Sequence, residues 1–201
     1  FPGQGAQYPG MGKGLYNASS SVQDLFKRAN EHMPFKLEEV IFDGSEEDRR
    51  ATDKTQVAVT ITSLSASMAL RERGIKPARA AGFSLGEYAA LAEAGVLAPE
   101  DLLPLVKIRG ELMEAASREL DGDAGPSGMI AAIGMDLATV RKTLEENDFT
   151  DAFPSMQNSP VQTVVSGTAA GLERAQAVLK TAGVRRVIPL KTSGPFHTPL
   201  M

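Results

Sequence analysis

The stretch Ala80-Ala81-Gly82-Phe83-Ser84-Leu85-Gly86-Glu87-Tyr88 contains a G-x-S-x-G motif, with small residues before it and a helix-forming run after it. This pattern predicts a nucleophile elbow, a sharp turn that holds a serine between a strand and a helix. We expect Pro77–Ala81 to form the short buried strand before the turn, and Glu87–Ala94 to form the helix after it, capped by Gly95. The turn would expose the hydroxyl of Ser84 beside the positive end of that helix, as acyl chemistry requires.

Composition limits the classes of protein that this chain can represent. It has 201 residues, 42% hydrophobic and 23% charged, which suffices for one large domain or two small ones. The net charge of −4 and the scattered basic residues argue against nucleic-acid binding. With no cysteine and two histidines, disulfides, thiolate chemistry and a metal site are not expected. No apolar run of membrane-spanning length and no signal peptide are evident, which favours a cytoplasmic enzyme or binding domain.

The pattern of elements changes near residue 121. Before it we expect long helices at Gln56–Arg73 and Pro99–Leu120; after it, elements follow in the order β-α-β-β-α-β, which is typical of a ferredoxin-like fold. The fold class is therefore α/β. We expect an α/β-hydrolase-like large subdomain with a parallel sheet and the nucleophile elbow, formed by residues 1–120 and 192–201. Residues 121–191 would form an inserted ferredoxin-like small subdomain.

A serine hydroxyl needs a base to become a nucleophile, and two histidines are candidates. His32 follows a polar helix and is expected to interact with the end of that helix. His197 lies in a loop that Gly194, Pro195 and Pro199 make rigid. Solvent exposure without a catalytic role is the alternative for this histidine, and both interpretations stay open from the loop alone.

Five motifs together resemble the malonyl-CoA:acyl carrier protein transacylases of fatty acid synthesis, and the related acyltransferase domains of polyketide synthases. They occur in one order along the whole chain: Phe1–Gln7, Gly82–Glu87, Arg109 within Ile-Arg-Gly-Glu-Leu-Met, Gln157–Pro160 and Pro195–Met201. By this resemblance the C-terminal part of the family is missing, so we expect the chain to be a fragment of a longer protein.

The resemblance implies a two-step transfer by a Ser-His dyad, with malonyl-CoA and acyl carrier protein as partners. Ser84 would take the malonyl group, and the phosphopantetheine thiol of the carrier would then remove it, with His197 as base and acid. The backbone N–H groups of Gln4 and Leu85 would form the oxyanion hole. No cofactor is implied, because the CoA thioester is a substrate.

Other positions match the family's substrate pocket. Arg109 matches the group that binds the malonyl carboxylate, where a guanidinium offers two parallel donors. Phe196 is expected to favour unbranched malonyl, and Asn158 and Gln56 match polar residues near the pocket. The family usually has a histidine where this chain has Phe83. We expect this difference to alter the rate or the selectivity of the reaction more than to abolish it.

Three functions remain after this comparison of motifs. The first is a discrete, cytoplasmic and monomeric malonyltransferase, or a polyketide synthase acyltransferase domain with another acyl preference. The second is a serine acyl hydrolase or thioesterase with water as acceptor. The third is a non-catalytic domain that docks a carrier protein, suggested by the truncation and by Phe83.

Overall fold

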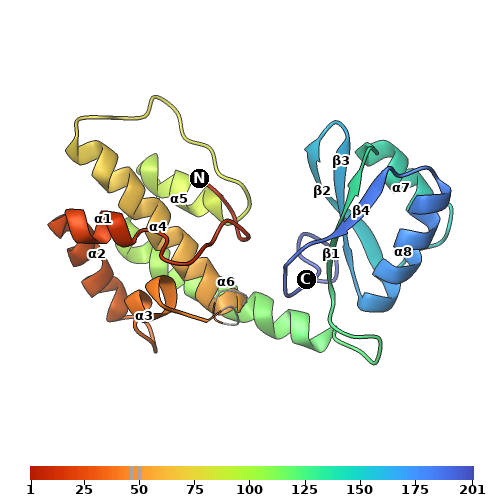
Figure 1. The fold of residues 1–201 in the computed structure, drawn as a ribbon, viewed down its shortest axis with the longest axis horizontal. Helices are drawn as coiled ribbons and strands as arrows, with labels where there is room; N and C mark the ends of the chain where they lie inside the picture. The colour runs from red at the N-terminus through yellow and green to blue at the C-terminus, as the bar shows by residue number, and fades with distance from the viewer. Residues whose placement is uncertain (46–47, 49–50) are drawn as a thin grey trace. The chain divides into compact units, whose positions relative to one another are not determined.

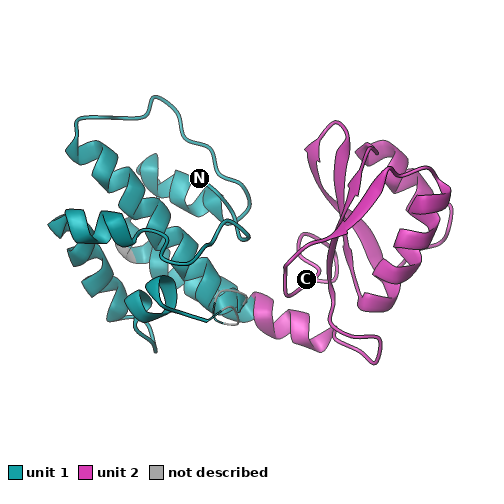
Figure 2. Ribbon diagram, in the orientation of Figure 1, with its two compact units in different colours: residues 1–112 teal, residues 113–201 magenta. Residues whose placement is uncertain are grey.

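A computed structural model describes the whole chain except residues 46, 47, 49 and 50. It divides into two compact units, Phe1–Leu112 and Met113–Met201 (Figure 2). The described part of the first unit is helical, and Figure 1 labels its helices. They are α1 (Lys13–Ala18), α2 (Ser20–Asn30), α3 (Leu37–Phe42), α4 (Thr52–Glu72), α5 (Gly86–Glu93) and the first part of α6 (Pro99–Glu119).

Helix α4 is largely buried in the first unit, since twelve of its 21 residues, polar and apolar, are buried. Val57 and Ile61 of α4 belong to one buried cluster with Phe26 of α2 and Leu102 of α6. The helix begins at Thr52, four residues before the start that the sequence predicts. Burial of these apolar side chains stabilises the unit, since each fully buried aliphatic or aromatic side chain contributes roughly 1.5–3 kcal/mol.

The buried strand expected at Pro77–Ala81 does not form, and this prediction was wrong. Residues 71–81 are exposed, and they contain Pro77, which has no N–H to donate. At the end of this segment, the Phe1 amino group donates to the Ala81 carbonyl at 2.7 Å. Ile75 and Pro77 instead line an apolar cavity of about 350 Å³ with Leu70 of α4. The expected parallel sheet is accordingly absent from residues 1–45, 48 and 51–112, since a sheet needs neighbouring strands to complete its hydrogen bonds.

The second unit contains a four-stranded antiparallel sheet with the strand order β2-β3-β1-β4. Its elements follow in the order β-α-β-β-α-β that the sequence predicts. They are β1 (Gly128–Ile133), α7 (Leu137–Glu145), β2 (Ala152–Ser159), β3 (Gln162–Gly167), α8 (Ala169–Thr181) and β4 (Arg186–Pro189). The central strand β1 pairs with β3 from Gly128↔Gly167 to Ile133↔Gln162, and with β4 on its other side.

The two faces of this sheet have different coverings, because side chains alternate along each strand. On one face Ile130 and Ala132 pack in a cluster with Val140 of α7 and Leu179 of α8 (Figure 1). Both helices begin at side-chain caps. At the start of α7, the Thr139 N–H donates to the Asp136 carboxylate at 2.7 Å, and this bond lowers the pKa of Asp136.

Candidate active site

Ser84 occupies a left-handed turn directly before α5. Its φ angle is +50°, a value that costs a non-glycine residue roughly 1–3 kcal/mol and that clusters at functional sites. The turn is closed by two backbone hydrogen bonds, from the Gly86 N–H to the Phe83 carbonyl at 2.9 Å and from the Glu87 N–H to the Ser84 carbonyl at 3.0 Å. The turn and the helix that follows it have the geometry of a nucleophile elbow, although the expected strand before it is absent.

Both glycines of the motif are required by close backbone contacts. A Cβ atom on Gly82 would lie 2.1 Å from the Glu87 nitrogen, and one on Gly86 would lie 2.2 Å from the Phe1 carbonyl oxygen. Such distances are impossible without moving the backbone, so the first residues of the chain cross directly over the elbow. The Phe83 N–H also donates to the Phe1 carbonyl at 3.0 Å.

The crossing of the N-terminal segment brings Gln4 to the neighbourhood of the elbow. A Cβ atom on Gly3 would lie 2.5 Å from the Phe83 carbonyl oxygen. The Gln4 side chain is half-buried and donates to the Thr52 hydroxyl at 3.3 Å, which ties the loop to the start of α4. Leu85 is 1% exposed and is the N-cap residue of α5. The loop and the helix start therefore both lie at the elbow, as an oxyanion hole formed by Gln4 and Leu85 would require.

Arg109 is held from α6 toward α4. Its Nη1 donates to the Gln56 side-chain oxygen at 2.6 Å, and Gln56 is completely buried. The two helices approach each other closely at Gly110 of α6. A Cβ atom on this glycine would lie only 2.9 Å from the Asp53 Cα of α4. A buried side chain, Gln56, therefore holds the Arg109 guanidinium.

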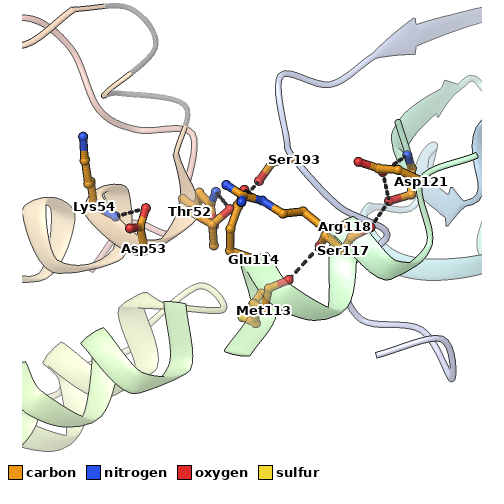
Figure 3. Close-up of polar contacts among 11 residues, drawn as sticks. Thr52, Asp53, Lys54, Met113, Glu114, Ser117, Arg118, Asp121 and Ser193 are labelled. Atoms are coloured by element: carbon orange, nitrogen blue, oxygen red, sulfur yellow. Dashed lines mark hydrogen bonds and ion pairs between the residues drawn. The ribbon is translucent and has the colours of Figure 1, made fainter. Parts of the chain in front are cut away.

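His197 lies in a loop that is bonded tightly within the second unit. Its φ angle is +62°, and a Cβ atom on Gly194 would lie 1.9 Å from the Ser117 hydroxyl of α6. Figure 3 shows the Ser193 hydroxyl donating to Glu114 at 3.3 Å, next to the bond from Ser117 to the Met113 carbonyl. The backbone that precedes His197 thus lies against the last turns of α6, and a rigid support of this kind is what a catalytic base requires.

Phe196 anchors this loop on the sheet face opposite to the helices. It is 4% exposed and packs in a cluster with Met129 of β1 and Val164 of β3. Asn158 is exposed in β2, beside an irregularity between Gln157 and Ser159. The first unit thus contains the predicted residues Ser84, Leu85, Gln4, Gln56 and Arg109, and the second contains His197, Phe196 and Asn158. The Ser84–His197 pair stays a prediction.

Among residues 1–45, 48 and 51–201, no three or more His, Asp or Glu side chains are grouped to hold a metal ion. None of the helices in these ranges has the length and apolar character that a membrane crossing needs. His32 is exposed just after the end of α2.

Comparison with known proteins places the chain in a class of acyl-transferring proteins. The family described as the acyl transferase domain matches residues 1–199. The malonyl CoA-acyl carrier protein transacylase of Bacillus subtilis is 41% identical over 205 residues, covering 100% of this chain and 62% of the relative. The polyketide biosynthesis protein PksE of the same organism is 39% identical over 203 residues, covering 100% of this chain and 25% of PksE.

A solved structure has the same architecture. It contains a malonyl-transacylase in complex with its type II polyketide synthase acyl-carrier protein, and the match has a TM-score of 0.90 and 35% identity over 100% of this chain and 64% of that chain. The chain belongs to the acyl transferase domain family. It spans 62% of the length of the Bacillus subtilis transacylase that it matches.

Proposed function

We propose that this chain carries the nucleophile, base and carboxylate-binding residues of a malonyl-CoA:acyl carrier protein transacylase. The observation that carries the proposal is the left-handed Ser84 turn at the start of α5, crossed by the N-terminal segment. The 41% identity to a malonyl CoA-acyl carrier protein transacylase supports malonyl as the acyl group. The solved complex of a relative with a carrier protein supports acyl carrier protein as the acceptor.

The proposed reaction has two symmetrical halves. His197 removes the proton of the Ser84 hydroxyl while its oxygen attacks the thioester carbon of malonyl-CoA, and the carbonyl oxygen becomes an oxyanion. The N–H groups of Leu85 and Gln4 donate to that oxyanion. The C–S bond then breaks, CoA leaves with the proton from His197, and a serine ester remains. The carrier's phosphopantetheine thiol attacks this ester by the same steps, which regenerates the Ser84 hydroxyl.

The proposal also covers the division of the chain into two lobes, the cellular location and the oligomeric state. Residues 192–201 would act with residues 1–120 as one large α/β-hydrolase-like lobe, and residues 121–191 as a ferredoxin-like lobe. We place the enzyme in the cytoplasm as a monomer acting in fatty acid synthesis, without cofactor or metal and without nucleic-acid or membrane partners.

Loading with malonyl-CoA tests the proposed function directly. In the full-length protein, we expect a single malonyl mass addition on the peptide that contains Ser84. Holo-acyl carrier protein should discharge it much faster than water does, because the carrier thiol is bound next to the ester. Intact-protein mass spectrometry after rapid quenching measures both rates. Discharge by water at the carrier's rate would establish the hydrolase alternative. Loading by another acyl-CoA in preference to malonyl would favour the alternative of a polyketide synthase acyltransferase domain.

Arg109→Ala is expected to reduce kcat/KM for malonyl-CoA about 30- to 1,000-fold while leaving acetyl-CoA use unchanged or increased. The reason is that the charge pair with a substrate carboxylate exists only for malonyl, and truncating one partner of such a pair costs about 2–4 kcal/mol. Competing acyl-CoA loading assays measure the ratio. Lys107→Ala, which removes the Lys107–Glu111 pair on the same helix, is the matched control. An equal loss for both substrates would remove Arg109 as the carboxylate-binding group.

A further inference from the structure

Three helices of the first unit converge on the Arg109 guanidinium. Gln56 of α4 accepts from its Nη1 at 2.6 Å. From α5, the Tyr88 ring lies beside it, with the guanidinium carbon 5.5 Å from the ring centroid. Tyr88 is half-buried and packs against the main core cluster of this unit. A guanidinium at this distance from an aromatic face is attracted to the negative charge of that face.

The two contacts restrain Arg109 in different ways. The Gln56 oxygen accepts one of the Arg109 N–H groups, and the complete burial of Gln56 fixes the position of that bond. The ring restrains the guanidinium plane without accepting a conventional hydrogen bond. Because arginine has five N–H donors, this arrangement leaves several of them for a planar, two-oxygen acceptor such as a carboxylate. A polar or charged neighbour in place of the ring would compete for those donors.

Position along the chain connects this ring to the nucleophile. Tyr88 lies four residues after Ser84, and it is in the first turn of the helix that begins at the elbow. The backbone of this turn is bonded to the elbow, since the Tyr88 N–H donates to the Leu85 carbonyl at 3.2 Å. One rigid segment therefore carries both the Ser84 hydroxyl and the ring that contacts Arg109.

We infer that Tyr88 is a positioning residue that orients the Arg109 guanidinium toward a carboxylate on the acyl group bound at Ser84. This inference rests on the proposed function and adds a determinant of selectivity for dicarboxylic acyl groups. The ring, and not the phenolic hydroxyl, performs the role. A phenylalanine at position 88 should therefore preserve the selectivity for malonyl, whereas an aliphatic residue of similar size should not.

Substitutions at Tyr88 in the full-length protein test the role of the ring. We expect Tyr88→Phe to keep kcat/KM for malonyl-CoA within about twofold. Tyr88→Leu should lower it about five- to thirtyfold, mainly through KM, with acetyl-CoA use unchanged. In the Arg109→Ala background, Tyr88→Leu should have no further effect on malonyl. The exposed Tyr8 offers a matched control, because Tyr8→Leu removes an aromatic ring from the N-terminal loop of the same unit. Tyr88→Met serves if the leucine variant does not fold.

Equal losses for malonyl and acetyl in Tyr88→Leu would overturn the inference, because the ring would then support only the elbow. A second measurement separates this outcome from failure of the proposed function. In ¹⁵N-arginine NMR spectra, assigned with Arg109→Lys, the ring current should shift the Arg109 Nε–H proton upfield in the wild type and in Tyr88→Phe. That shift should vanish in Tyr88→Leu. An unchanged proton shift would contradict the inference, whether or not Ser84 accepts malonyl.

Discussion

Ser84→Ala is expected to abolish transfer of malonyl from CoA to the carrier, with a loss of at least about 10⁴-fold. The alanine has no oxygen to form the ester, and the oxyanion donors and substrate contacts that remain supply only a small residual rate. Quenched-flow release of CoA and the mass of the intact protein measure the loss. Full malonyl loading of the alanine variant would exclude both catalytic functions and leave the carrier-docking alternative.

Ser84→Gly is the matched control for this substitution, since it also removes the hydroxyl but tolerates the φ angle of +50°. Both variants should be inactive, but the glycine variant should be more stable to urea than the alanine variant by roughly 1 kcal/mol. This order reverses the usual preference for alanine in ordered backbone. A more stable alanine variant would mean that residue 84 is not in the left-handed conformation, and the elbow geometry would be wrong.

His197→Ala is expected to slow acylation of Ser84 about 10²- to 10⁴-fold, because the serine proton then has no positioned acceptor. Pre-steady-state loading of Ser84 with malonyl-CoA measures the acylation rate of both proteins.

His32 provides the control, because it is the other histidine of the chain and lies exposed beyond α2. His32→Ala should load at the wild-type rate within about twofold. In addition, the Ser84→Ala/His197→Ala double variant should be no slower than Ser84→Ala, because residues that act as one unit have non-additive effects. Loss of less than tenfold in His197→Ala would remove this residue as the base, and with it the proposed pairing of residues 84 and 197.

Local sequence chemistry predicts much of this fold correctly. The apolar spacing in residues 56–73 predicts most of α4, and glycine and serine at 82, 84 and 86 predict the turn before α5. The alternation of short apolar runs and helical segments after residue 127 predicts all four strands and both helices of the second unit in order. These features depend on interactions within a few residues, so a linear pattern is enough to indicate them.

Features that depend on distant partners were not predictable in this way. The segment at Pro77–Ala81 has small residues compatible with a strand, but a strand forms only where other backbone completes its hydrogen bonds. Tyr88 could have been noted for its position one helical turn after Ser84, yet nothing in that spacing predicts the contact of its ring with a residue of α6. The Gln56–Arg109 hydrogen bond is a second example, because it joins residues 53 positions apart in the chain.

The amino-acid sequence alone determined the left-handed turn at Ser84, because glycine on both sides permits backbone contacts that any Cβ atom would block. It also determined the element order of the second unit. Tertiary structure decided which side chains surround Arg109, since the packing of α4, α5 and α6 brings a buried amide and an aromatic ring to one guanidinium. Helix periodicity defines the faces of each helix, but the partner of a face is selected only when the helices pack together.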